Sequence, residues 1–403
     1  MPPIFRLDRT IMTHRERILT AIRGEVPDRL PWVPRLEFWH RARLRQGTLP
    51  PELCSLTLTE ITERLGVGCY SSIPDFTDVA NADAMIDRAL GILHHPVLPY
   101  RVTLENVDRR VIQRGQETVV EYHTPLGSIR TCMVFTEEML NSGVSVPWTV
   151  AHAIRAPRDF EVVGYIMSHL RIEPQGQGYL ARRQEVGERG LAVALVQGTA
   201  CPIQYIMREL MPLDQFFYAL HDYPEKVHRL AEQIEPFFQQ TQTIGAESPA
   251  EVLMLGGNYD DSITYPSFFE KYFFPALRDY AAVLHRRGKY LMTHTDGENQ
   301  RLFPLYRRAG FDIADSVCPY PMTRCRLEEI RVNFGDHVTI WGGIPSTLLC
   351  ASSTPEDEFR RSIDETIERY AHESHFILGV SDMVTADCEW DRLQYITEKV
   401  ATT

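Results

Sequence analysis

The residues whose types and spacing could support chemistry in this chain directly follow short apolar runs. The most distinctive is His294, which ends the run 290–293 and is followed by Asp296 and Gly297. A His-x-Asp pair can reach one point, where it could hold a metal ion through imidazole nitrogen and carboxylate oxygen. Without a metal, Asp296 could orient the imidazole while His294 donates to a substrate carboxylate or acts as a general acid. Both interpretations stay open at this point.

Other polar side chains follow further apolar runs and could complete the same site. Asp260 stands in a loop that begins with Gly256 and Gly257, where the backbone can turn sharply. Arg35 ends the first run and is the best-placed cation for a substrate carboxylate. The predicted catalytic residues are His294, Asp296 and Asp260, and the predicted metal ligands are His294, Asp296, Asp382 and Cys318. The predicted substrate-binding residues are Arg35, Glu37, Trp39, Gln197, Asn258, Tyr259 and Tyr320.

The elements that must position these side chains are eight short apolar runs, most of which are followed by a longer helical pattern. This alternation is typical of βα units, and eight such units close a barrel whose reactive groups stand at the carboxyl ends of the strands. We therefore predict a (β/α)₈ TIM barrel. The predicted strands cover residues 29–35, 67–73, 191–197, 252–256, 290–294, 311–317, 338–341 and 376–380.

A long interval, about residues 75–190, separates the second predicted strand from the third. We interpret it as an insertion, with a β-hairpin formed by residues 118–123 and 128–134 around the turn 125–127. An insertion there is either a lid or partner-docking surface over the barrel mouth or a packing elaboration. Residues 1–12 are expected to form a loose tail before a barrel that spans residues 13–403. The spacing of Thr13 and Glu16 predicts a capping box that opens the first helix.

Composition excludes some classes of function. The 403 residues carry a formal net charge of −12, which argues against binding to nucleic acid because that needs a basic surface. The longest apolar runs are too short to cross a bilayer, and no signal-peptide segment precedes the first helix, so we expect a cytosolic protein. The eight cysteines are sparse and are expected to be reduced thiols. The sequence does not indicate an oligomeric state.

Several motifs carry a family resemblance. They are 17–31, with Ala21-Ile22-Arg23-Gly24-Glu25, then Gly256-Gly257-Asn258, His294-Thr295-Asp296-Gly297, Ala309-Gly310-Phe311-Asp312, Phe334-Gly335-Asp336, Trp341-Gly342-Gly343-Ile344 and Phe376-Ile377-Leu378-Gly379. From about residue 13 to 398 the chain resembles the uroporphyrinogen-decarboxylase superfamily. The resemblance implies the same barrel.

Two branches of this superfamily compete. True uroporphyrinogen decarboxylases carry an Arg-Gln-Ala-Gly-Arg segment after the first strand, whereas this chain has Arg35-Leu36-Glu37-Phe38-Trp39, in which Glu37 would repel a polyanionic substrate. Cobamide-dependent methyltransferases carry a zinc site of His-x-Cys plus a distant Cys. Here His294 matches, but Asp296 and Asp382 fall at or near the places of the two cysteines. The resemblance therefore implies an oxygen-rich site, with zinc or without a metal.

We therefore predict a methyltransferase that moves a methyl group from a small methyl ether or amine to a corrinoid protein, with zinc as a candidate cofactor. The first alternative is a decarboxylase of a tetrapyrrole or a smaller carboxylic acid. The second is a non-catalytic barrel that binds a ligand or a corrinoid protein.

Overall fold

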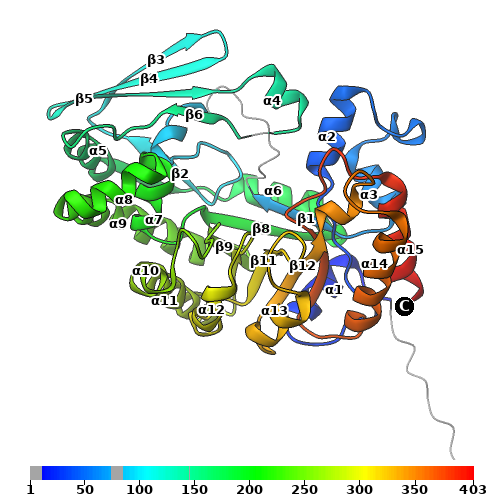
Figure 1. Cartoon of the computed structure of the whole chain (residues 1–403). Helices are drawn as coiled ribbons and strands as arrows, with labels where there is room; N and C mark the ends of the chain where they lie inside the picture. Colours follow the sequence, from blue (N-terminus) through cyan, green and yellow to red (C-terminus); the bar gives the residue numbers. More distant parts are fainter. Residues whose placement is uncertain (1–10, 74–84, 145) are drawn as a thin grey trace, which may run out of the picture.

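The computed structural model describes residues 11–73, 85–144 and 146–403. The predicted tail lies almost entirely outside these residues, as does the start of the predicted insertion. Seven parallel strands of the described residues form one curled sheet in the order β1-β8-β9-β10-β11-β12-β13 (Figure 1). Their bounds are β1 Cys69–Ile73, β8 Gly190–Gln197, β9 Val252–Gly257, β10 Tyr290–His294, β11 Ile313–Val317, β12 Thr339–Pro345 and β13 Phe376–Ser381. Strands covered on both faces read as continuous apolar runs, and this is why seven of the eight predicted strands are confirmed within a few residues.

The first predicted strand, residues 29–35, is the exception. It makes only one parallel bridge, between Trp32 and Leu378 of β13. Pro31 and Pro34 flank that bridge and lack the N–H groups that a longer ladder needs. On its other side, the carbonyl of Trp32 accepts a hydrogen bond of 2.9 Å from the amide of Gly68, just before β1. The segment thus lies between β13 and the start of β1, in a TIM-barrel-like α/β fold.

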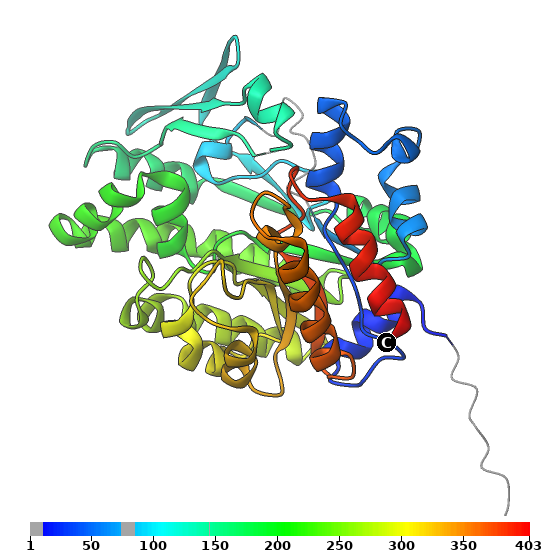
Figure 2. The same cartoon turned by 45° about the vertical axis from the view of Figure 1, so that its right-hand side comes forward.

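Helices alternate with the parallel strands and cover the outer face of the sheet (Figures 1 and 2). The predicted capping box of Thr13 and Glu16 is present at the first helix. No helix in the described ranges is long and apolar enough to span a membrane. The helices are α1 His14–Ile22, α2 Glu37–Gln46, α3 Leu58–Leu65, α4 Glu137–Asn141, α5 Asp159–Ser168, α6 Gln177–Val186, α7 Pro202–Tyr205, α8 Leu213–Asp222, α9 Pro224–Glu247, α10 Pro266–Tyr272, α11 Phe274–His285, α12 Phe303–Ala309, α13 Leu327–Phe334, α14 Glu356–Tyr370 and α15 Trp390–Thr402.

The chain between β1 and β8 builds two antiparallel sheets. One pairs β2 Tyr100–Leu104 with β7 Leu170–Pro174. The other has the order β3-β4-β5-β6, with β3 Asp108–Arg114, β4 Glu117–Thr124, β5 Gly127–Val134 and β6 Trp148–Ala151. The predicted hairpin is confirmed as β4 and β5, which pair antiparallel from Thr124 and Gly127 outwards. Figures 1 and 2 both place the four-stranded sheet above the parallel sheet, beside α5.

Gly190 at the start of β8 gives a test of the packing in the parallel sheet. A Cβ added there would overlap the backbone carbonyl of Cys69 on β1, the residue with which Gly190 pairs. Because backbone atoms of two paired strands cannot easily move apart, we expect Gly190→Ala to lower the free energy of unfolding by about 3 kcal/mol, measured by urea denaturation. Gly198→Ala, just beyond the same strand, is the control, since a Cβ there meets no described atom within 4 Å. An equal loss in both variants would contradict the predicted overlap.

Candidate active site

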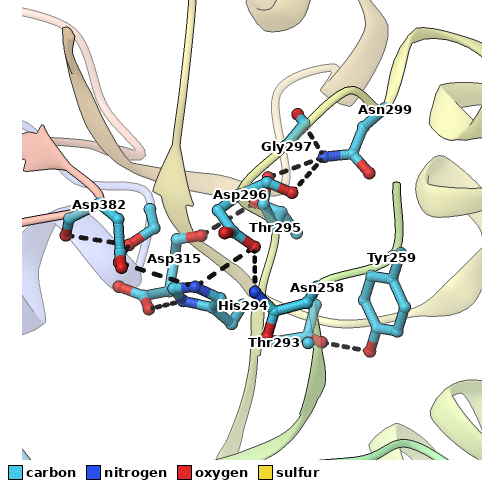
Figure 3. A network of polar contacts seen from close by, with 12 residues as sticks. Asn258, Tyr259, Thr293, His294, Thr295, Asp296, Gly297, Asn299, Asp315 and Asp382 are labelled. Atoms are coloured by element: carbon cyan, nitrogen blue, oxygen red, sulfur yellow. Dashed lines mark hydrogen bonds and ion pairs between the residues drawn. The ribbon is translucent and has the colours of Figure 1, made fainter. Parts of the chain in front are cut away.

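The ends of β10, β11 and β13 bring one histidine and its partners together (Figure 3). His294 is the last residue of β10, and the sheet register pairs it with Asp315 of β11. Parallel partners project their side chains to the same face, so the imidazole Nδ1 lies 2.7 Å from Oδ2 of Asp315. The Asp315 side chain is 2% exposed. This carboxylate fixes the ring plane and leaves Nε2 to face the other groups of the site.

The other ring nitrogen of His294 faces two further carboxylates. Nε2 lies 3.4 Å from Oδ1 of Asp296 and 3.6 Å from Oδ1 of Asp382. Burial opposes a charge on the ring, but the hydrogen bonds to Asp296 and Asp315 and the charge of Asp382 outweigh it and raise the pKa of His294 well above 6.5. His294 is therefore an imidazolium at neutral pH.

Asp382 follows β13 and belongs to this group. The hydroxyl of Ser316 donates to its Oδ1 at 2.7 Å, and a guanidinium nitrogen of Arg35 lies 3.6 Å from the same oxygen. Burial favours the neutral acid, but the charges of His294 and Arg35 and the Ser316 hydrogen bond together lower the pKa of Asp382. Asp382 is thus an anion. Arg35 also stacks on the ring of Tyr70, with its guanidinium carbon 5.1 Å from the ring centre.

Asp296 is held by a chain of polar groups that the sequence did not fully reveal. The amide of Asn258, a residue in the left-handed region with φ 53°, donates to Oδ1 of Asp296 at 2.8 Å. Arg208, in a π-helical turn Ile206–Leu210, donates at 2.8 Å to the side-chain oxygen of Asn258. The side-chain amide of Asn299 stabilises the turn by donating to three consecutive carbonyls, those of residues 295, 296 and 297. Asn258, which was predicted to bind substrate, hydrogen-bonds to Asp296 here.

Two predicted aromatic substrate contacts lie in the core instead, which corrects those predictions. Trp39 is fully buried, donates its ring N–H to the carbonyl of Cys388 at 3.0 Å and stacks on Trp390. Tyr259 is also fully buried, with its hydroxyl 2.6 Å from that of Thr293. Large rings near strand ends pack under the helices here because remote segments supply apolar neighbours for them.

The remaining predicted residues lie in different surroundings. Asp260 accepts a hydrogen bond of 2.9 Å from the amide of Ser262 and caps its own loop. Tyr320 is 60% exposed, with Arg326 over its ring. Glu37 lines a separate cavity that is described below. Gln197 is buried at the end of β8, and its amide nitrogen has no hydrogen-bond partner in the described structure. Of this set, only Gln197 offers an uncommitted buried donor.

Of the predicted metal ligands, His294, Asp296 and Asp382 lie together at this site. Among the residues that the structure describes, no three or more His, Cys, Asp and Glu side chains are placed to hold a metal ion. Both ring nitrogens of His294 face carboxylates. Burial, together with the charges of Asp296 and Asp382, raises the pKa of the Cys318 thiol to about 12, so it is no thiolate at neutral pH.

This arrangement can support proton transfer by His294. An imidazolium whose Nδ1 is anchored to a buried carboxylate presents its Nε2 proton in a fixed direction. The flanking carboxylates stabilise positive charge at this point. The same site can therefore donate a proton to a departing oxygen or nitrogen atom.

Comparison with known proteins agrees with the fold. The model of the uroporphyrinogen decarboxylase (URO-D) family matches residues 139–402. Among solved structures, a methyltransferase from Methanosarcina mazei aligns with a TM-score of 0.53 and 13% identity, covering 97% of this chain and 99% of that chain. At this identity the likeness shows the fold alone. No curated protein matches the sequence.

Proposed function

The chain belongs to the uroporphyrinogen decarboxylase family, and we propose that within this family it is a methyltransferase that takes a methyl group from a small methyl ether or amine and passes it to a corrinoid protein. The observation that carries the proposal is the imidazolium of His294 among three carboxylates. We also propose a complete (β/α)₈ barrel in which residues 31–33 replace one strand, because residues 31–33 hydrogen-bond to both β13 and Gly68. In this barrel an insertion separates the second strand from the third.

The charges of the site support a neutral or cationic substrate. In the described part of the chain, the ion pairs of Asp296, Asp315 and Asp382 involve two cationic groups, those of His294 and Arg35. A tetrapyrrole with several carboxylates would be repelled by such a group of anions, because like charges within a few ångströms are unfavourable in a poorly solvated site. A neutral ether or a methylated ammonium ion adds no negative charge. The site therefore favours methyl transfer over decarboxylation of a polyanion.

The chemistry follows from the position of the Nε2 proton. When the bond between methyl carbon and ether oxygen breaks, its electron pair stays on the oxygen, which becomes basic as the methyl group leaves. His294 donates its Nε2 proton to that oxygen, so that an alcohol or phenol departs rather than an anion. Asp315 holds Nδ1–H throughout, and the neutral ring takes up a proton from water afterwards. A reduced corrinoid on a partner protein would supply the nucleophile that accepts the methyl group.

Other residues of the site bind and orient. Gln197, whose buried amide nitrogen has no hydrogen-bond partner among the described residues, is proposed to donate to the substrate oxygen or to a substituent beside it. Asn258 and Arg208 keep Asp296 near Nε2, where its charge keeps the ring protonated. Arg35 keeps Asp382 ionised beside the ring. In this mechanism residues of this chain hold and donate the proton that the leaving oxygen receives.

The proposal is tested by supplying the purified protein with reduced cobalamin and one methyl donor at a time. The donors are an uncharged aryl methyl ether, tetramethylammonium and a methoxybenzoate, and uroporphyrinogen serves as the decarboxylation substrate. We expect methylcobalamin, seen by its absorbance, and the matching demethylated product, seen by mass spectrometry, from the neutral or cationic donor. Release of carbon dioxide from uroporphyrinogen without any methyl transfer would instead establish the decarboxylase alternative.

A further inference from the structure

A cavity separate from the group around His294 is lined by residues of β1 and of the helices α2, α3 and α6. Along β1 the hydroxyls of Tyr70 and Ser72 reach the sulfur atoms of Met292 and Met254 in the barrel interior. Ser71 alternates with them and therefore lines the cavity on the opposite face of the sheet. The cavity has a volume of about 380 Å³. In the described part of the chain, none of its lining residues belongs to the group around His294.

Cationic and hydroxyl groups line much of this cavity. The cavity is lined by three arginines, which are Arg41, Arg182 and Arg189, and by two carboxylates, those of Glu37 and Glu185. Arg182 lies 3.6 Å from Glu185 and Arg189 lies 3.6 Å from Glu63, and both arginine side chains are only 28% exposed. Partly buried charges are screened less by water and salt than exposed ones. The lining residues thus include one more arginine than carboxylates, despite the acidic balance of the whole chain.

His40 in α2 supplies the second observation. It lines the cavity, and its Nε2 is buried without a hydrogen-bond partner among the described atoms. Burial and the neighbouring charge of Arg41 lower the pKa of His40, so the ring is neutral and carries one N–H. A buried polar atom without a partner is unfavourable, and native structures rarely keep one unless a ligand or water completes it. The hydroxyls of Thr59 and Ser71 stand in the same wall.

We propose that this cavity binds a small molecule through a phosphate group. Phosphate has several acceptor oxygens that point in different directions, and here guanidinium, imidazole and hydroxyl donors come from α2, α3, α6 and β1. The volume exceeds that of one phosphate ion and leaves space for a small organic part. The inference is independent of methyl transfer, because it uses no residue of the group around His294.

The test is isothermal titration of the full chain with inorganic phosphate, at an ionic strength held constant with sodium chloride. We expect saturable binding by the wild type and a loss of affinity of about tenfold or more in Arg182→Gln, since a charge-assisted hydrogen bond is removed. The matched control is Arg183→Gln in the same helix. Arg183 lies 3.7 Å from Glu251 and does not line the cavity, so its replacement should leave the affinity unchanged.

Ser71→Ala is the second variant, because it removes one hydroxyl and no charge and leaves the ion pair of Arg182 with Glu185 in place. We expect it to weaken phosphate binding severalfold without a change of melting temperature. The proposal is overturned if the wild type shows no saturable binding at constant ionic strength. It is equally overturned if Arg183→Gln weakens binding as much as Arg182→Gln, because the effect would then be general surface charge.

Discussion

His294→Ala is expected to slow methyl transfer by about 1000-fold, because positioned general acids contribute roughly two to four orders of magnitude to such reactions. Without the imidazolium, the departing oxygen must leave as an anion among the carboxylates of Asp296, Asp315 and Asp382. The measurement is the initial rate of methylcobalamin formation from the aryl methyl ether, whose departing oxygen needs the proton.

The substitution also leaves Asp315 buried without its partner, so the melting temperature must be measured alongside the rate. His294→Gln keeps a polar side chain at the position and separates loss of the proton donor from loss of folding. His285→Ala is the matched control, since that histidine pairs with Asp312 at 2.9 Å on the outer helix α11 and is expected to be dispensable. Wild-type rates in a folded His294→Ala protein would remove His294 from the mechanism.

Asp315→Asn is expected to reduce the rate at neutral pH by about 100-fold, with almost no change in side-chain volume. Asp315 is one of the groups that raise the pKa of His294, so removal of its charge should lower that pKa. The ring then loses its proton at a lower pH, and the alkaline limb of the pH–rate profile moves towards neutrality. A purely structural effect would lower the rate without moving this limb.

The sign of the pH dependence of stability follows from the same shift. The pKa of His294 is higher in the folded chain than the ordinary value near 6.5, so its contribution to stability is full below pH 6.5 and is lost as the pH rises through the folded value. Nuclear magnetic resonance of ¹⁵N-labelled histidine rings follows the titration directly. Asp312→Asn, which alters the carboxylate beside His285, is the control. If His294 titrates identically in Asp315→Asn and in the wild type, the anchoring role of Asp315 is wrong.

Local pattern was enough to predict most of the parallel sheet. The run 290–294 is predicted and observed with the same bounds as β10, and the run 376–380 becomes β13 with one more residue. Strands buried on both faces need uninterrupted apolar residues, and that need is visible within each run. The convergence of His294, Asp296 and Asp382 follows from the same logic, because the carboxyl ends of parallel strands meet at one edge of a barrel.

The contact between Asp315 and His294 could not be predicted from the local sequence pattern. Asp315 stands inside the predicted strand 311–317, a position that suggests an interior residue rather than a functional one. Only the pairing of β10 with β11 places it opposite His294. Arg208 is a similar case, since its contact with Asn258 joins segments 50 residues apart. The residues adjacent to Asp315 and to Arg208 in the sequence do not indicate that either belongs to the site.

The sequence by itself determined the order of the βα units, the ends of most strands and the presence of an imidazole and two carboxylates at those ends. The tertiary structure decided which groups lie against the imidazole, and that Trp39 and Tyr259 pack in the core. The physical reason is that strand formation depends on the residues of one segment, whereas burial and the pKa of a side chain depend on charges and rings supplied by segments far away in the chain.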